Sequence, residues 1–134
     1  MSASSYQGLK VWQKAMDLAA VIYKLTKKLP KEELYSLSDQ MRRSAISIPS
    51  NIAEGQDRNT DRDFARFLTI SRGSKAELET QLLICVKVGY LNEADIKEAM
   101  DILNEIGRML SSLITKLKND NSATPDNQEL KTEN

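Results

Sequence analysis

The spacing of the apolar side chains is the strongest constraint on the fold, because they recur every three or four residues along four stretches of the chain. This spacing gathers them on one face of a helix, and no stretch shows the alternation of a half-buried strand. The expected helices cover residues 9–29, 36–54, 61–88 and 93–118. Because the connections are short, successive helices run antiparallel. The sequence therefore predicts an all-α fold, an antiparallel up-down-up-down four-helix bundle.

Residues that favour helix starts stand at the expected boundaries. Ser36 and Asp39 resemble a capping box, in which each side chain accepts a hydrogen bond from a backbone N–H of the other residue. Thr60 and Asn92 are expected N-caps of the third and fourth helices. The residues 31–33 predict an irregular helical turn before the second helix.

Proline and glycine mark the expected helix ends. Pro30 ends the first helix, because the residue before proline avoids the α region. Gly55 and Gly89 are expected after the second and third helices, in the left-handed conformation that glycine adopts readily. Pro49 lies inside the second helix, where we expect a kink. Two further glycines are expected where helices pack closely: Gly73 and Gly107.

Each expected helix has one face that we assign to the core. The core positions are Leu9, Trp12, Met16, Ala19, Tyr23 and Thr26 in the first helix, Leu37, Met41, Ala45, Ile48 and Ile52 in the second, Phe64, Phe67, Leu68, Ser71, Leu78, Leu82 and Cys85 in the third, and Ile96, Met100, Leu103, Gly107, Leu110, Ile114 and Leu117 in the fourth.

The apolar surface is wider than one bundle needs. The apolar arc of the last helix spans about 180°, against roughly 100° for a surface helix. Its additional apolar residues are Ala99, Ile102, Ile106, Met109 and Leu113, and the second and third helices add Ile46, Ala53, Ala65, Ala76 and Leu83. We expect this excess to contact another subunit. The alternative is a helix whose wide face lies entirely against its own core.

Charge divides the chain although its formal sum is zero. Residues 1–30 carry a net charge of +4 and residues 119–134 a net charge of −3. Polar residues dominate the second segment, so we expect a disordered acidic tail. The expected organisation is an N-terminal extension over residues 1–8, the bundle over residues 9–118 and the tail over residues 119–134. This mildly basic body permits a weak contact with a polyanion.

The residue types exclude several kinds of chemistry. The chain has no histidine, which removes the commonest general base and the imidazole ligand of most metal sites. Its single cysteine, Cys85, lies on a core face and is expected to be a small buried hydrophobe. We therefore expect no enzyme, no catalytic residue, no cofactor and no metal. Without a signal pattern or an apolar run of about 20 residues, we expect a cytoplasmic protein without a membrane span.

Two stretches, residues 42–55 and 64–79, are unusual for a simple bundle. They bring proline, glycine, serine and asparagine into helix interiors. We expect the stretches to face each other, with Asn51 or Ser44 meeting Ser74 or Glu77 in a polar network. The alternative is that each group bonds its own helix or water. The residues of this structural motif are Pro49, Asn51, Glu54, Gly55, Gly73, Ser74 and Glu77.

A family resemblance rests on these same stretches. It is carried by residues 9–12 (LKVW) with Ala15, by residues 47–55 (SIPSNIAEG), by Phe64, by residues 72–74 (RGS) and 77–82 (ELETQL), and by residues 89–91 (GYL). Over about residues 6–118 the chain resembles the bacterial four-helix-bundle family named after proteins encoded in intervening sequences of 23S rRNA genes. The resemblance implies a ring-like homopentamer.

A related bundle, the accessory variability protein of diversity-generating retroelements, partners a reverse transcriptase and binds nucleic acid through a basic surface. This chain departs from it in charge, since its sequence pI is about 6.3. The leading hypothesis is a non-catalytic binding or scaffold protein that contacts RNA or DNA through a basic rim of the pentamer. The candidate contacts are Arg42, Arg43, Arg58, Arg62, Arg66, Arg72 and Lys75. The alternatives are surface ion pairs for these cations, and a protein-interaction adaptor without nucleic-acid binding.

Overall fold

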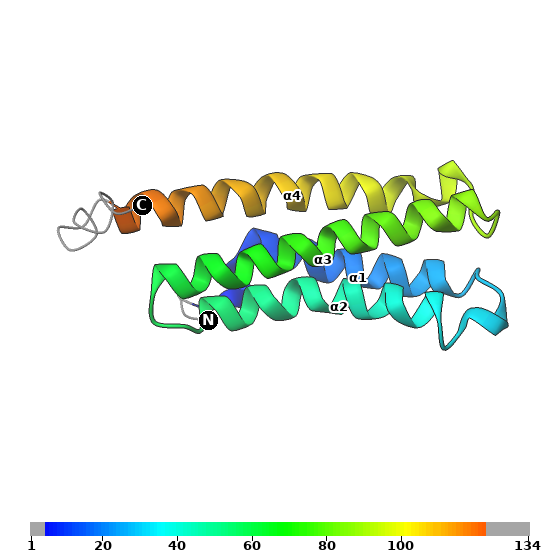
Figure 1. The fold of residues 1–134 in the computed structure, drawn as a ribbon, viewed down its shortest axis with the longest axis horizontal. Coiled ribbons are helices and arrows are strands. Elements are labelled where there is room, and N and C mark those ends of the chain that lie inside the picture. The colour runs from blue at the N-terminus through cyan, green and yellow to red at the C-terminus, as the bar shows by residue number, and fades with distance from the viewer. Residues whose placement is uncertain (1–4, 123–134) are drawn as a thin grey trace.

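The computed structural model describes residues 5–122 and consists of four long helices (Figure 1). They are α1 (Lys10–Thr26), α2 (Leu37–Gln56), α3 (Asp61–Lys87) and α4 (Glu93–Ser122). Two short 3-10 helices, η1 (Tyr6–Gly8) and η2 (Lys31–Glu33), precede α1 and α2. No strand occurs within the described residues. The predicted all-α class and the four helices are confirmed.

Contacts between neighbouring helices show the antiparallel arrangement, because residue numbers fall along one helix as they rise along its partner. The contacting pairs are Ser47–Ser74 and Gly55–Phe67 between α2 and α3, Arg72–Ser111 and Lys75–Gly107 between α3 and α4, and Lys14–Glu105 and Lys28–Asp95 between the α1 segment and α4. The chain therefore runs up, down, up and down, and α1 closes the bundle against α4.

The buried face of α1 differs from the predicted one. Its core residues are Val11, Ala15, Leu18, Ile22 and Leu25, all at most 6% exposed. Of the predicted stripe only Thr26 is buried, while Met16 and Tyr23 are 46% and 44% exposed; Leu9, Trp12 and Ala19 pack at the margin of the core. The helix carries two apolar stripes. The purely aliphatic stripe is buried because it fills the core without enclosing a polar atom.

The predicted core faces of α2 and α3 are confirmed, with Leu37 and Phe64 at the margin of the core. In α4, Met100 and Gly107 are only partly buried, whereas Ala99 and Ile106 are fully buried inside the bundle. The wide apolar arc of α4 therefore lies partly against its own core, whereas the alternative placed all of it there. Ile102, Met109 and Leu113 of that arc remain half-buried.

The expected caps of α3 and α4 form. Thr60 accepts a hydrogen bond from the Asp63 N–H, with 3.1 Å between nitrogen and oxygen. The Asp95 N–H donates to the Asn92 side chain at 2.8 Å, and the Asn92 N–H donates to the Asp95 carboxylate at 2.9 Å. Gly89 has a φ angle of +86°, the left-handed conformation expected of it.

The predicted capping box at Ser36 does not form. The Ser36 hydroxyl instead donates to the Glu33 carboxylate at 2.6 Å, and the Leu37 N–H donates to the same oxygen at 3.4 Å. Tyr90, from the α3–α4 connection, donates its hydroxyl proton to the other Glu33 oxygen at 2.8 Å. Hydrogen bonds from Ser36, then from Tyr90 and Leu37, lower the pKa of Glu33. This carboxylate therefore ties both connections at one end of the bundle together.

The prediction that Gly55 ends α2 in a left-handed conformation is wrong. Gly55 is buried inside the last turn of α2, and a Cβ atom at this position would lie 2.7 Å from the Phe67 Cβ. Gly55 is therefore required because α2 and α3 approach each other closely there. Gly73, predicted at a close contact, is exposed, and a Cβ atom added there would meet nothing within 4 Å. Gly107 does lie against the Lys75 side chain.

The described chain does not coincide with the predicted domain limits. Residues 6–8, assigned to the extension, form η1, and α4 continues to Ser122, four residues beyond the predicted end of the bundle at 118. The remainder of the predicted acidic tail, residues 123–134, and residues 1–4 lie outside the described residues. None of the described helices combines the length and the apolarity that crossing a membrane requires.

Two glycine substitutions test the close approach of α2 and α3. Gly55→Ala is expected to lower the free energy of unfolding by about 1–3 kcal/mol, because the Phe67 Cβ lies next to the backbone and cannot move away easily. The matched variant Gly73→Ala has open space and should raise it by about 1 kcal/mol through helix propensity. Urea unfolding measures both. Equal effects of the two substitutions would contradict the packing argument.

The hydrogen bonds at Glu33 predict a dependence of stability on pH. Because they lower its pKa in the folded state, their contribution is complete above the unfolded pKa and is lost as pH falls through the folded value. Glu33→Gln should therefore reduce the loss of melting temperature between about pH 5 and pH 3. Thermal unfolding followed by circular dichroism measures it. A parallel decline in the wild-type protein and the variant would argue against this role.

Candidate functional site

A small polar network joins the two unusual stretches across the α2–α3 contact. The Asn51 amide donates to the Ser47 carbonyl at 2.9 Å and to the Ser47 hydroxyl at 3.0 Å. The Ser47 hydroxyl in turn lies 2.8 Å from the Ser74 hydroxyl. The stretches thus face each other as predicted, and Asn51 reaches Ser74 through its own helix. Sequence reasoning missed the linking residue Ser47.

A second hydrogen bond crosses the same contact beside Pro49. The buried Ser71 hydroxyl donates to the Ile48 carbonyl at 2.9 Å. Pro49 is buried next to this carbonyl, inside an α2 that continues without interruption to Gln56. Ser44 is buried on α2 and Glu77 is exposed on α3, so the network runs through Ser47 rather than through either of them. The hydrogen bonds of this stretch therefore join α2 to α3.

Arginines gather around Phe67 where α2 passes into α3. The Arg58 guanidinium lies 4.8 Å and the Arg66 guanidinium 4.7 Å from the centre of the Phe67 ring. Arg58 also pairs with Glu54 at 2.6 Å. Such cation–π contacts hold guanidinium groups in place while leaving their edges in water. Arg62 is exposed one turn before Arg66.

The structure does not bring all seven predicted contact residues together. Arg42 and Arg43 lie near the start of α2, toward the opposite end of the bundle. Arg42 donates to the Leu34 carbonyl at 3.1 Å, and Arg43 pairs with Asp39 at 2.9 Å. Arg43 and Arg58 therefore form surface ion pairs, which was the alternative interpretation of these cations.

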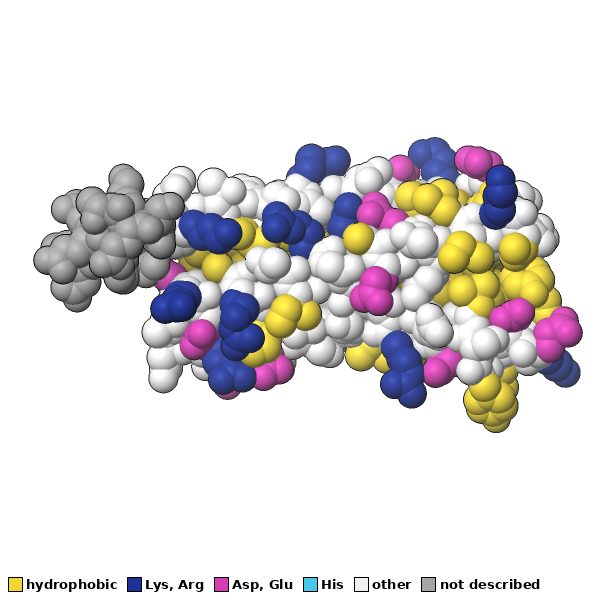
Figure 2. All heavy atoms as spheres, viewed as in Figure 1, with side chains coloured by type: hydrophobic (Ala, Val, Ile, Leu, Met, Phe, Trp, Pro, Cys, Tyr) yellow, Lys and Arg dark blue, Asp and Glu magenta, His cyan; other side chains and the backbone are white. Residues whose placement is uncertain are grey.

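A different set of cations lies on α3 and α4, and we call this set the basic surface. Its members are Arg66, Arg72, Lys75, Arg108, Lys116 and Lys118. Shallow hollows connect them. Arg72, Lys75 and Arg108 line one between the helices, and Lys116 shares another with Arg108. Arg66 and Lys118 line a third, together with the carboxylates of Asp61 and Asp63. Figure 2 shows dark-blue side chains over this half of the two helices.

No carboxylate lies in the two segments that carry the basic surface. Residues 64–76 and 106–119 together hold six basic and no acidic residues. Residues 77–105, toward the other end of the hairpin that α3 and α4 form, hold seven acidic and two basic residues, and Asp61, Arg62, Asp63 and Asp120 flank the basic segments. Charge is therefore segregated along this helix pair, although the whole chain sums to zero.

Within the described residues, only Lys75 of the basic surface forms an ion pair, with Glu79 at 3.0 Å. Arg72 makes a weak contact with the Ser111 hydroxyl at 3.4 Å. In the acidic half, by contrast, two carboxylates are paired with lysines of another segment: Glu105 with Lys14, and Asp95 with Lys28. Five cations thus keep their charge available to an external anion.

Sequence reasoning found three members of the basic surface and missed Arg108, Lys116 and Lys118. The predicted contacts come from the unusual stretches of α2 and α3, and α4 contains no such stretch. The available signal was the run from 106 to 119, which has three cations and no acidic residue.

Cys85 is buried in the core, as expected, with its sulfur 3.6 Å from the Met41 sulfur. Burial, with the nearby charge of Glu33, raises the pKa of its thiol. A protonated, enclosed thiol is a poor nucleophile. Residues 5–122 contain no group of three or more acidic or cysteine side chains arranged to hold a metal ion.

Comparisons with known proteins agree with the fold. The model of the 23S rRNA-intervening sequence protein family matches residues 7–112. A similar solved structure is a protein of unknown function from the S23 ribosomal protein family of Bacteroides thetaiotaomicron VPI-5482. It is 28% identical with a TM-score of 0.72, over 78% of this chain and 97% of that chain. No curated protein matches this chain.

The polar network predicts coupling between Ser47 and Ser74. Each serine-to-alanine substitution is expected to cost about 1 kcal/mol of unfolding free energy, and the double variant should cost less than the sum, because the bond is lost only once. Asn51→Leu should also destabilise the protein. Chemical unfolding of the four proteins in the cycle gives the coupling, with exposed Ser50→Ala as a control. Additive losses would show that the serines act separately.

Proposed function

The chain belongs to the 23S rRNA-intervening sequence protein family, and we propose that it is a non-catalytic, oligomeric protein that binds RNA or DNA through its basic surface. The observation that carries this proposal is the concentration of six cations in two segments of α3 and α4, residues 64–76 and 106–119, that hold no acidic residue themselves. Phosphate groups are the ligands that such a surface suits, because unpaired cations release counterions when they neutralise a nucleic-acid backbone.

The dimensions of the basic surface fit a short length of backbone. From Arg66 to Lys75, and from Arg108 to Lys118, each helix advances by about 14–15 Å. A strand of duplex DNA carries one phosphate for about every 3.4 Å of axis, so this length corresponds to about four phosphates. Side chains of this kind position a nucleic acid without reading its bases. Recognition would therefore depend on the shape of the nucleic acid.

Assembly would strengthen a weak site of this size. Exposed apolar side chains remain on three helices, among them Met16 and Tyr23 on α1, Ile46 on α2 and Ile70 on α3. We assign them to contacts between copies, and the homopentamer implied by the family resemblance would repeat the basic surface five times. Linked copies gain affinity by avidity without any new contact.

The hydrophobic end of the molecule favours a second candidate, a protein-interaction adaptor. Several large apolar side chains there are between 43% and 90% exposed: Leu34 and Tyr35 before α2, and Leu83, Ile84 and Val88 near the end of α3. Figure 2 shows hydrophobic side chains concentrated at this end, opposite the half with most of the basic surface. Exposed apolar groups of this kind mark surfaces that bind other proteins. An adaptor would use this end and need no nucleic acid.

Salt dependence tests the nucleic-acid proposal. Binding to a labelled structured RNA and to a matched DNA duplex should weaken log-linearly with salt, measured by fluorescence anisotropy while light scattering gives the mass of the assembly. The variant Arg72→Ala/Arg108→Ala should weaken binding to both ligands and reduce the salt slope by about two per bound subunit, since each contact contributes about one.

The control is Arg42→Ala/Arg43→Ala, which removes the same charge from the other half of the bundle and should leave the slope unchanged. If both double variants reduce binding equally, the basic surface as defined is not the site. If the wild-type protein binds neither ligand at low salt, the adaptor becomes the better account.

A further inference from the structure

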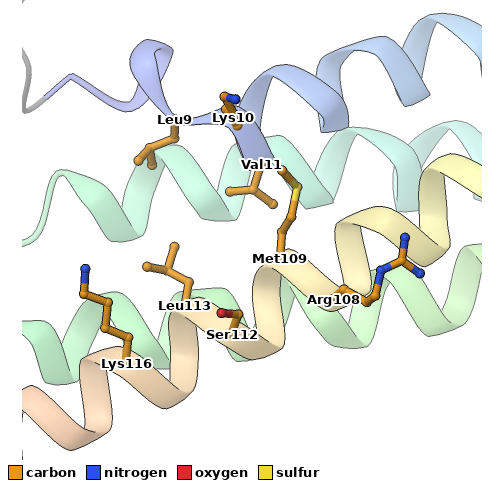
Figure 3. A pocket seen from close by; sticks show the side chains of 8 residues that line it. All are labelled: Leu9, Lys10, Val11, Arg108, Met109, Ser112, Leu113 and Lys116. Carbon is orange, nitrogen blue, oxygen red and sulfur yellow. The ribbon is translucent and has the colours of Figure 1, made fainter.

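A groove between the start of α1 and the last third of α4 has an apolar floor. Leu9 and Val11 project from the α1 side toward Met109 and Leu113 of α4 (Figure 3). The groove is open to solvent and has a volume of about 430 Å³, and three of these four side chains are only partly buried. Met109 and Leu113 belong to the apolar arc of α4 that the bundle leaves incompletely covered. This α1–α4 groove therefore offers apolar surface to a further segment.

The rim of the α1–α4 groove is basic. Lys10, Arg108 and Lys116 line it, and no acidic residue does. None of these three cations forms an ion pair within the described residues. An occupant that complements the groove must combine an apolar side chain with several carboxylates along a short peptide.

Residues 123–134, which follow directly on α4, have this composition. They carry three acidic residues and one basic residue, with Leu130 as their one large aliphatic side chain. The acidic residues, Asp126, Glu129 and Glu133, flank Leu130 on both sides. The segment thus matches the groove both in charge and in its single apolar group.

The segment is also long enough. Met109 lies 13 residues before Ser122, a distance of about 20 Å along the helix. The eight residues from Ser122 to Leu130 span up to about 26 Å when extended. Leu130 can therefore reach the floor of the groove if the segment turns back along α4.

We propose that residues 123–134 fold back into the α1–α4 groove of the same chain, with Leu130 on Met109 and Leu113 and the carboxylates facing the rim. Because Arg108 and Lys116 also belong to the basic surface, the docked segment competes with nucleic acid for these two cations. This competition rests on the function proposed above, whereas the docking itself does not.

Disulfide formation in the full chain tests the docking. The variant Ser112→Cys/Gln128→Cys places one thiol in the groove, and Ser111→Cys/Gln128→Cys places it on the adjacent residue, in the hollow between α3 and α4. Both serines are exposed and about equally far from residue 128 along the chain, and Cys85 is buried. With glutathione disulfide as oxidant, the intrachain bond to residue 112 should form at least about fivefold faster, because docking raises the local concentration.

Adding Leu130→Asp to the Ser112→Cys/Gln128→Cys variant should abolish the difference in rate. Equal rates for the two placements, or no effect of Leu130→Asp, would overturn the proposal. Mixing isotopically heavy and light protein separates the possible occupants. Heavy–light disulfides in the proportion that random pairing gives would assign the groove to a second copy and would likewise reject docking within the chain.

Binding to the structured RNA tests the competition separately. The variant Asp126→Asn/Glu129→Gln/Glu133→Gln should bind about threefold more tightly at low salt, because the rim cations are released. Unchanged affinity in a protein that cross-links as expected would reject the competition. If no variant binds RNA, the proposed function fails while the cross-linking rates still decide whether the segment docks.

Discussion

The close contact between α2 and α3 is the constraint on which the other helices depend. Small side chains line this contact. Gly55 leaves room for Phe67, the Ser47 hydroxyl is hydrogen-bonded to the Ser74 hydroxyl, and the Ser71 hydroxyl donates to the carbonyl before Pro49. Polar groups inside this contact must be paired, so only one register of the two helices satisfies them. That register fixes which side of α3 remains for α4, and so places Arg72 and Lys75 beside Arg108.

The sequence determined the helices because their signals are local. The caps at Thr60 and Asn92 and the left-handed Gly89 depend on a few neighbouring residues, and all three were predicted. The errors concern packing between helices. α1 offers two apolar stripes with the same period, and periodicity cannot decide which one the other helices cover. Gly55 has the spacing of a helix end, but its role is set by Phe67, twelve residues later.

The basic surface was predictable only in part for a related reason. Arg66, Arg72 and Lys75 lie in a stretch that its mid-helix glycine and serines made conspicuous. Arg108, Lys116 and Lys118 stand in an otherwise ordinary helix, and a total charge of zero gives no reason to examine them. They form part of one basic surface only because α3 and α4 lie side by side, which joins two moderately basic segments.

The segregated charges of α3 and α4 have a consequence for the approach of a ligand. One half of the hairpin that α3 and α4 form is net basic and the other half is net acidic, so its distant field is that of a dipole. A polyanion nearing the protein would experience a torque before any contact, and would arrive with the basic half foremost. This preorientation would act on the rate of encounter, and only within the Debye length, about 8 Å at physiological ionic strength. A protein without net charge can therefore favour one orientation in its encounters with a polyanion.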